Sequence, residues 1–306
     1  MAGTKEIKRR IKSVKNTKKI TKAMELVSAS KMKRAVSSTL ASRLYAEYSW
    51  EVLTSIAQNG DQINHPFFQE KEAKDLKNRI LVVLITSNRG LCGSYNAQAI
   101  KKAIALLKSQ GDKVNFDFLT IGKRGDTAMR RLGREVIATF TELSDKISLS
   151  QVSPISKMIS DEYMMGKYDK VMVVYTDFIS ALNQKPNIKQ ILPIEKSTLK
   201  DLIDELEDLS HHSKLKDSGG KTEYLFEGEK DKFVGVLAEK LTQMQIYQML
   251  LESNASEQSS RMVAMKNASE ASGEMIDDLT LVFNKARQSN ITREISEISA
   301  GMASVS

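Results

Sequence analysis

The feature that most constrains this chain is a stretch near its end, residues 229–301, with no proline and only three glycines, Gly235, Gly273 and Gly301. Nothing in this stretch forces an α-helix to stop. At 1.5 Å per residue, about 70 helical residues make a rod of roughly 100 Å, which is longer than a domain of this chain's size. We therefore expect one long helix that projects from the rest of the protein.

The apolar residues of this stretch recur in alternating steps of three and four. Counted back from Ala286, eleven of fifteen such positions are apolar. A stripe this narrow is typical of a helix that faces one partner helix in a shallow left-handed supercoil. The fifteen positions are Leu237, Leu241, Met244, Gln248, Leu251, Ala255, Gln258, Met262, Met265, Ser269, Ser272, Ile276, Leu279, Phe283 and Ala286.

The partner helix is expected at the other end of the chain, because residues 4–59 also contain neither glycine nor proline. Breaks near Thr17 and Ser30 interrupt its apolar pattern, which predicts packing on its mate for part of its length and on other subunits elsewhere. The apolar positions are Ile7, Ile11 and Val14, then Ile20, Met24 and Val27, then Val36, Leu40 and Leu44.

The N-terminal helix also holds the positive charge of the chain. The formal net charge is +8, and residues 5–34 carry twelve Lys and Arg against Glu6 and Glu25. The rest of the chain is therefore net acidic. A basic stripe attracts nucleic acid, anionic lipid or carboxylates on a protein partner, unless it is simply a solvated face.

Composition is that of an ordinary soluble chain of about two domains, with 306 residues, 41% hydrophobic and 27% charged. The longest wholly apolar run, 80–85, is far shorter than the roughly 20 residues of a membrane span. We expect neither export nor insertion into a bilayer. The single cysteine, Cys92, excludes an intrachain disulfide and favours a reducing compartment.

Between the two helices, buried-type strands alternate with amphipathic helices. This order predicts a mostly parallel sheet covered on both faces, a Rossmann-like α/β domain. We expect strands at 79–86, 115–121, 135–141, 170–175 and 188–193, the last an edge strand ending in a proline, and helices at 97–109, 124–132, 153–165 and 199–209. The predicted domains are a coiled-coil helix at 1–59, the α/β domain at 75–225 and a coiled-coil helix at 229–306.

The turn after the first strand, residues 87–96, lies where a Rossmann-like fold binds phosphate. Its glycines, Gly90 and Gly93, form only GxxG and lack the dinucleotide and P-loop fingerprints, which favours a plain tight turn. Cys92 has no evident base, and the pair His211 and His212 lacks further ligands at metal spacing. We therefore predict no catalytic, cofactor or metal site, and no enzyme activity of the chain itself.

Four motifs, in order along the chain, give it a resemblance to a known family. They are ITKAMELVSASKMKRA at 20–35, RGLCG at 89–93, SEQSSRMVAMKNA at 256–268 and LVFNKARQSNITREISEI at 281–298. With these motifs the chain resembles the gamma subunits of F-type rotary ATP synthases, nearly from end to end. The resemblance implies an antiparallel coiled coil of the two terminal helices inside a ring of alpha and beta subunits, with the α/β domain on the membrane c-ring.

The same resemblance implies a function and a set of contacts. The chain would be a non-catalytic rotor shaft that couples proton flow to ATP synthesis or hydrolysis, next to an epsilon subunit, as a peripheral protein on the cytoplasmic face of a bacterial membrane. The lone Cys92 excludes the dithiol switch of photosynthetic relatives. The implied contacts with the catalytic ring are Met24, Arg261, Arg287, Gln288, Thr292 and Glu294, and those with the membrane ring are Tyr224 and Glu227.

Two other functions compete with this one. A basic coiled coil that binds nucleic acid would explain the stripe at 5–34, but such a dimer needs neither the α/β domain nor the longer C-terminal helix. A nucleotide-dependent α/β enzyme would explain the middle of the chain, but the sequence offers no site for its chemistry.

Overall fold

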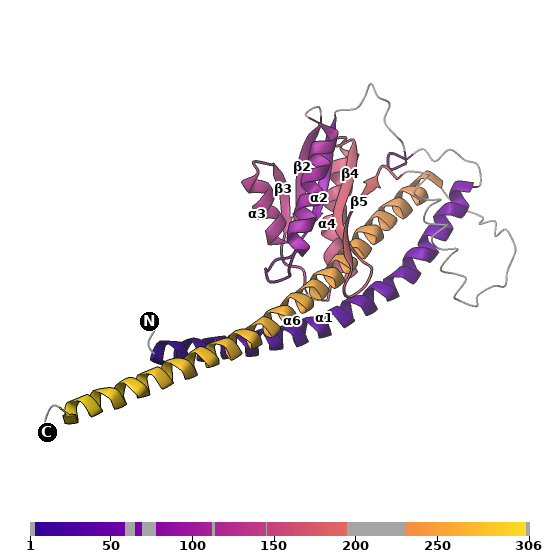
Figure 1. Cartoon of the computed structure of the whole chain (residues 1–306). Coiled ribbons are helices and arrows are strands. Elements are labelled where there is room, and N and C mark those ends of the chain that lie inside the picture. The colour runs from indigo at the N-terminus through magenta and orange to yellow at the C-terminus, as the bar shows by residue number, and fades with distance from the viewer. Residues whose placement is uncertain are drawn as a thin grey trace. The chain divides into compact units, whose positions relative to one another are not determined.

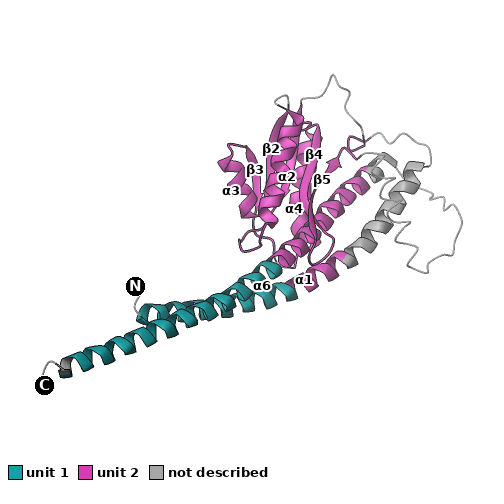
Figure 2. Cartoon of the chain, in the orientation of Figure 1, with its two compact units in different colours: residues 1–30, 261–306 teal, residues 31–260 magenta. Residues whose placement is uncertain are grey.

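The computed structural model describes residues 4–58, 65–68, 78–111, 114–144, 146–194 and 230–303, without the side chains of 40–58, 230–234, 301 and 303. The chain divides into two compact units, one made of residues 1–30 and 261–306 and the other of residues 31–260 (Figure 2). The two longest helices, α1 (Thr4–Gln58) and α6 (Lys230–Ala303), contribute to both units. The predicted helix at 199–209 lies outside the described residues.

The larger unit contains a five-stranded sheet in the order β3-β2-β1-β4-β5 (Figure 1). Strands β1 to β4 are parallel to one another, and the edge strand β5 is antiparallel to β4. The predicted parallel sheet is therefore confirmed, with an edge strand that begins earlier than expected. The strands are β1 (Arg79–Ile85), β2 (Asn115–Ile121), β3 (Val136–Phe140), β4 (Lys170–Phe178) and β5 (Gln184–Leu192).

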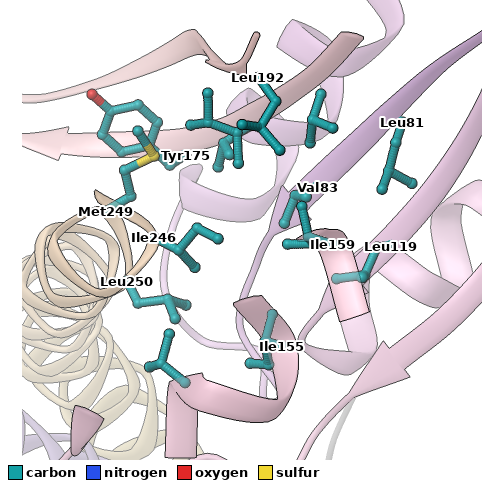
Figure 3. Close-up of a cluster of buried hydrophobic side chains, with 14 of the residues drawn as sticks. Leu81, Val83, Leu119, Ile155, Ile159, Tyr175, Leu192, Ile246, Met249 and Leu250 are labelled. Carbon is teal, nitrogen blue, oxygen red and sulfur yellow. The ribbon is translucent and has the colours of Figure 1, made fainter. Parts of the chain in front are cut away.

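Helices cover both faces of the sheet. Successive side chains of a strand point to opposite faces, so each strand supplies apolar residues to both. On one face, Val82 and Leu84 of β1 pack among residues of α2 (Tyr95–Gln110) and α3 (Lys123–Arg131). On the other face, Leu81 and Val83 belong to the cluster formed with α4 (Leu149–Met164) and α6. In Figure 3, Ile246 and Leu250 of α6 point into this second cluster.

In the larger unit, α6 is therefore a core helix as well as a coiled-coil helix. Between Leu241 and Ser259 no residue is exposed, and the buried positions lie on all sides of the helix. This differs from the single narrow stripe that the periodicity predicts. The reason is that this part of α6 also buries other faces, outside the predicted stripe, against the cluster on the sheet.

In the smaller unit, the seam of α6 follows the predicted positions. All fifteen positions of the predicted seam, here and in the larger unit, are buried or half-buried, and the last of them is Ala286. A Cβ added at Gly273 would lie 2.8 Å from Lys18 Nζ, so α1 crosses α6 there. At one end of this unit, the start of α1 lies near Ala286, the last of the described side chains of α6 that is not exposed. At the other end, Ser28 of α1 and Arg261 of α6 are both buried. The two helices are therefore antiparallel, as predicted.

The seam of α1 differs in part from the predicted one. Ile7 is buried and Ile11 and Val14 are half-buried, as expected, but the seam then continues through the polar residues Thr21 and Ser28. The predicted seam residues Ile20 and Val27 are wrong, because their side chains are 60% and 54% exposed. Steps of three and four from Ile7 pass through Thr21 and Ser28, which leaves Ile20 and Val27 on the outer side.

Candidate functional site

At the carboxyl edge of the sheet, where α/β folds bind phosphate, side chains and a carbonyl of the chain itself occupy the start of helix α3. The N–H groups of Lys123, Arg124 and Gly125 open helix α3. They donate to Asn88 Oδ1 at 3.0 Å, to the carbonyl of Ser87 at 3.1 Å and to Thr86 Oγ1 at 2.8 Å. Free N–H groups at a helix start are what phosphate binds. At α3, three consecutive residues after β1 occupy them.

Next to α3, Asp126 is held as a carboxylate. Burial raises the pKa of Asp126, but hydrogen bonds from Arg130 at 2.7 Å and from Thr139 at 2.8 Å outweigh this and leave the pKa below its usual value. The charge therefore serves an ion pair within the helix and a bond to β3. It is not poised to exchange a proton near neutral pH.

The turn after β1 holds the cysteine in a closed network. Cys92 is buried, its sulfur accepts a hydrogen bond from Asn96 Nδ2 at 3.1 Å, and it lies 3.7 Å from Ser87 Oγ. Asn96 also donates to Ser87 Oγ at 2.7 Å and accepts from the Ser87 N–H at 2.9 Å. These neighbours are neutral and none is a base, so they give the thiol no activation.

The tip of the same turn has an unusual backbone. Leu91 has a φ of 64° and its side chain is 61% exposed. The left-handed conformation costs a residue other than glycine roughly 1–2 kcal/mol. The network of Ser87 and Asn96 therefore holds the turn in a strained shape and presents an apolar side chain to the outside.

The outer face of α1 in the smaller unit combines apolar and basic side chains. Ile20 and Val27 are seven residues apart and share one face of the helix. Around them lie exposed cations, of which Lys22 pairs with Glu25 of its own helix at 3.0 Å. Exposed pairs of this kind contribute little to stability. This face can bind an apolar surface that carries carboxylates.

The end of α6 has a second unpartnered face. Every described side chain from Arg287 to Met302 is exposed, because α1 begins opposite Ala286. Ile291, Ile295 and Ile298 follow one another in steps of four and three, which places them on one face. Three exposed isoleucines on a single helix indicate a surface that another protein covers.

Comparisons with known proteins agree over the whole chain. A family model described as ATP synthase matches residues 3–305. The chain is 35% identical over all 306 residues to the ATP synthase gamma chain of Legionella pneumophila strains Corby and Paris, and the alignment covers 100% of both chains. The chain belongs to the ATP synthase gamma-chain family. No helix in the described ranges of this gamma-family chain is both long and apolar enough to cross a membrane.

Solved structures of ATP synthase assemblies contain chains of similar fold. A chain of the central stalk and c-ring of the Tetrahymena thermophila mitochondrial ATP synthase matches with a TM-score of 0.57 at 25% identity, over 82% of this chain and 99% of that one. A chain of the Euglena gracilis mitochondrial ATP synthase in rotational state 3 shares the fold, with a TM-score of 0.66 at 19% identity, over 99% of this chain and 94% of that one.

The predicted gamma-family contacts fall into two groups along the smaller unit. Met24 and Arg261 lie in the paired part of the helices, where Met24 is half-buried and Arg261 is only 9% exposed. Gln288 lies beyond the pairing, and since Lys18 crosses Gly273, it is roughly 30 Å from the level of Met24 at 1.5 Å per residue. The exposed group comprises Arg287, Gln288, Thr292 and Glu294.

Tyr224 and Glu227, the predicted contacts with the membrane ring, lie outside the described residues. Ile291, Ile295 and Ile298 are absent from the predicted site, although their spacing in the sequence carries the signal. The predicted apolar stripe ends at Ala286, where the pairing with α1 ends, whereas the three isoleucines lie on the unpaired part of the helix.

Proposed function

We propose that this chain is the central rotor shaft of a proton-translocating ATP synthase, which transmits torque from the membrane c-ring to the alpha and beta subunits. Membership of the gamma-chain family supports this role. The structural observation that carries it is the difference in length between the two helices. Helix α6 continues for more than four turns beyond Ala286 with an exposed apolar face, which a protein sleeve around the helix would cover.

Contact with the ring is proposed at two levels of the shaft. At the free end, Arg287, Gln288, Thr292 and Glu294 are exposed beside the apolar face and are available to the ring. Lower down, the basic and apolar outer face of α1 meets acidic loops of the catalytic subunits, and Met24 lies at its edge. Arg261 is buried, so we propose that it acts by holding the helix pair in place.

The chain itself is proposed to have no catalytic activity. The support is that the N–H groups at the start of α3 are occupied by Thr86, Ser87 and Asn88, and that Cys92 is buried among neutral groups. A phosphate would have to displace three internal hydrogen bonds to bind at α3. The nucleotide chemistry of the complex is then left to the ring subunits.

The remaining partners follow from the same role. Tyr224 and Glu227 are proposed to contact the c-ring, and an epsilon subunit is proposed to accompany the shaft. The complex would sit on the cytoplasmic face of a bacterial membrane, with this chain as a peripheral component. These assignments come from the family resemblance of the sequence.

Rotation is the property that tests the function most directly. The complex of this chain with its alpha and beta subunits is immobilised through the ring, and a visible probe is attached to a cysteine placed at the exposed Leu132. Adding ATP should turn the probe in one direction. The control is a complex with inactive catalytic subunits, in which the probe stays still. ATP hydrolysis by the ring with a motionless probe would contradict the proposal.

A further inference from the structure

Strand β4 extends beyond the strand that should cover its inner edge. The pairing of β1 with β4 ends at Leu84 and Val174, whereas β4 continues to Phe178 and pairs there only with β5. Alternate residues of a strand direct their backbone groups to opposite edges. Thr176, two residues after Val174, therefore directs its N–H and carbonyl toward the edge that β1 has left.

Two serines of α6 replace the missing strand. The N–H of Thr176 donates to Ser253 Oγ at 3.1 Å, and Ser256 Oγ donates to the carbonyl of Thr176 at 3.2 Å. Both serines are fully buried and lie three residues apart, on one face of the helix. The two bonds satisfy the N–H and the carbonyl of Thr176, which the fold buries without a neighbouring strand.

The same face of α6 continues onto the turn between β4 and β5. Ser259 Oγ donates to the carbonyl of Ala181 at 2.5 Å, and Ser260 Oγ donates to Gln184 Oε1 at 3.0 Å. Gln184 also donates from Nε2 to Ser259 Oγ at 3.4 Å. Short serine side chains allow the helix backbone to approach the hairpin closely. The hydrogen bonds therefore run along two turns of α6.

These bonds differ in kind from the apolar packing around them. The cluster in which Met249 and Leu250 take part attracts the helix without fixing its direction, because hydrophobic burial is not directional. A hydrogen bond to a fixed peptide group holds only within a narrow range of distance and angle. Ser253 and Ser256 therefore define one rotation of α6 about its own axis relative to the sheet.

We infer that Ser253 and Ser256 are the joint through which torque passes between the α/β fold and helix α6. The inference rests on the proposed rotor function. A helix under torque tends to turn or slide on an apolar surface, and the two backbone bonds at Thr176 oppose both movements. Helix α6 then carries the torque onward, because it is continuous from Lys230 to Ala303.

The test replaces both serines by alanine, Ser253→Ala with Ser256→Ala, in the complete ATP synthase reconstituted into vesicles. The matched control is Ser272→Ala, which removes a hydroxyl that donates only within its own helix, to Ala268 at 2.7 Å. Each lost hydrogen bond should shift the equilibrium between the attached and detached helix by about fivefold. Losing both should therefore shift it roughly 25-fold toward the detached state. We expect proton pumping per ATP hydrolysed to fall in the double variant and to stay normal in the control.

A second variant decides the question if the alanine chain does not assemble. Cysteines at Thr176 and Ser256, in a Cys92→Ala background, are joined by a disulfide across the joint. Oxidised complexes should pump normally, and reduction should lower pumping. Equal pumping by the alanine variant and the Ser272→Ala control, or a disulfide that stops pumping, would overturn the inference. An unaltered chain that assembles but does not rotate would instead contradict the proposed function.

Discussion

The hydroxyl oxygen of Thr86 accepts a hydrogen bond from the N–H of Gly125 at 2.8 Å, and it lies 3.3 Å from the carbonyls of Ile121 and Gly122. One buried side chain thus ties the end of β1 to the end of β2 and to the start of α3. The contrast is Thr176, whose hydroxyl is buried without a hydrogen-bond partner in the described part of the chain. Both residues are buried threonines, but only the hydroxyl of Thr86 has hydrogen-bond partners in the described part of the chain.

The same substitution should therefore act in opposite ways at the two positions. Thr86→Val leaves the N–H of Gly125 buried without its acceptor and should lower the free energy of unfolding by about 1–3 kcal/mol. Thr176→Val removes an unsatisfied hydroxyl, keeps the branched shape and should leave the free energy unchanged or raise it. Urea unfolding of the isolated chain measures both. A loss at Thr176 as large as that at Thr86 would contradict this assignment.

At Gly122 the backbone of the chain passes very close to the backbone of Thr86. Gly122 has a φ of +100°, and a Cβ at this position would lie 2.1 Å from the carbonyl oxygen of Thr86. Gly122→Ala should therefore cost several kcal/mol or prevent folding, because backbone cannot move aside as a side chain can. The control is Gly133→Ala, where φ is +68° and no atom lies within 4 Å. There only the backbone strain of about 1–2 kcal/mol remains. Thermal unfolding that ranks the two variants equally would be evidence against the close contact.

The strands were predictable because β1 and β4 contain short apolar runs bounded by turn residues. The seam of α6 was predictable because its period of three and four persists for fifteen positions. The seam of α1 was not, because Thr21 and Ser28 are polar residues at seam positions while Ile20 and Val27 are apolar residues on the outer face. An apolar pattern indicates every face that a helix buries. It does not show whether that face packs on the partner helix of the same chain or on another subunit.

The joint at Ser253 and Ser256 shows a second limit. The sequence gives no sign that β4 outruns β1, since that depends on the register between two strands almost ninety residues apart. The motif SEQSSRMVAMKNA carries the family resemblance, but the reason for its three serines is visible only in the structure. There Ser256 bonds to Thr176, Ser259 to Ala181 and Ser260 to Gln184. Polar residues on a buried helix face are informative once their partners are known.

The unpaired end of α6 leads to a prediction about assembly. Replacing Ile291, Ile295 and Ile298 by serine removes the apolar face and none of the residues paired with α1. The unfolding midpoint of the isolated chain should stay nearly the same. Assembly with the alpha and beta subunits should weaken, because each isoleucine buried in the ring contributes about 1.5–3 kcal/mol.

Deleting residues 304–306 is the control for that experiment, because it shortens the same end of the chain and keeps the isoleucines. Sedimentation or gel filtration of the reconstituted complex measures assembly. Equal assembly of the triple serine variant and the short deletion would show that the ring does not cover this face.

The last prediction concerns relative motion, and it uses two cross-links of different kinds. Cysteines at Lys18 and Gly273 join α1 to α6, whose side chains meet at this point. A short bis-maleimide between them should leave ATP turnover intact, because the two helices turn together. A disulfide from a cysteine at Gln288 to an acidic loop of a catalytic subunit joins the shaft to its surroundings, and it should stop turnover until it is reduced.

The contrast between the two links separates rotation from simple binding. One asymmetric shaft presents a different face to each of three equivalent catalytic subunits and so biases each toward a different nucleotide affinity through differential contacts. Blocking the change of faces blocks the cycle, whereas stiffening the shaft does not. A chain that only holds the ring together would tolerate both links equally. Full formation of the link at Gln288 with unchanged turnover would therefore show that the shaft does not turn there, and that Gln288 has no place in the moving interface.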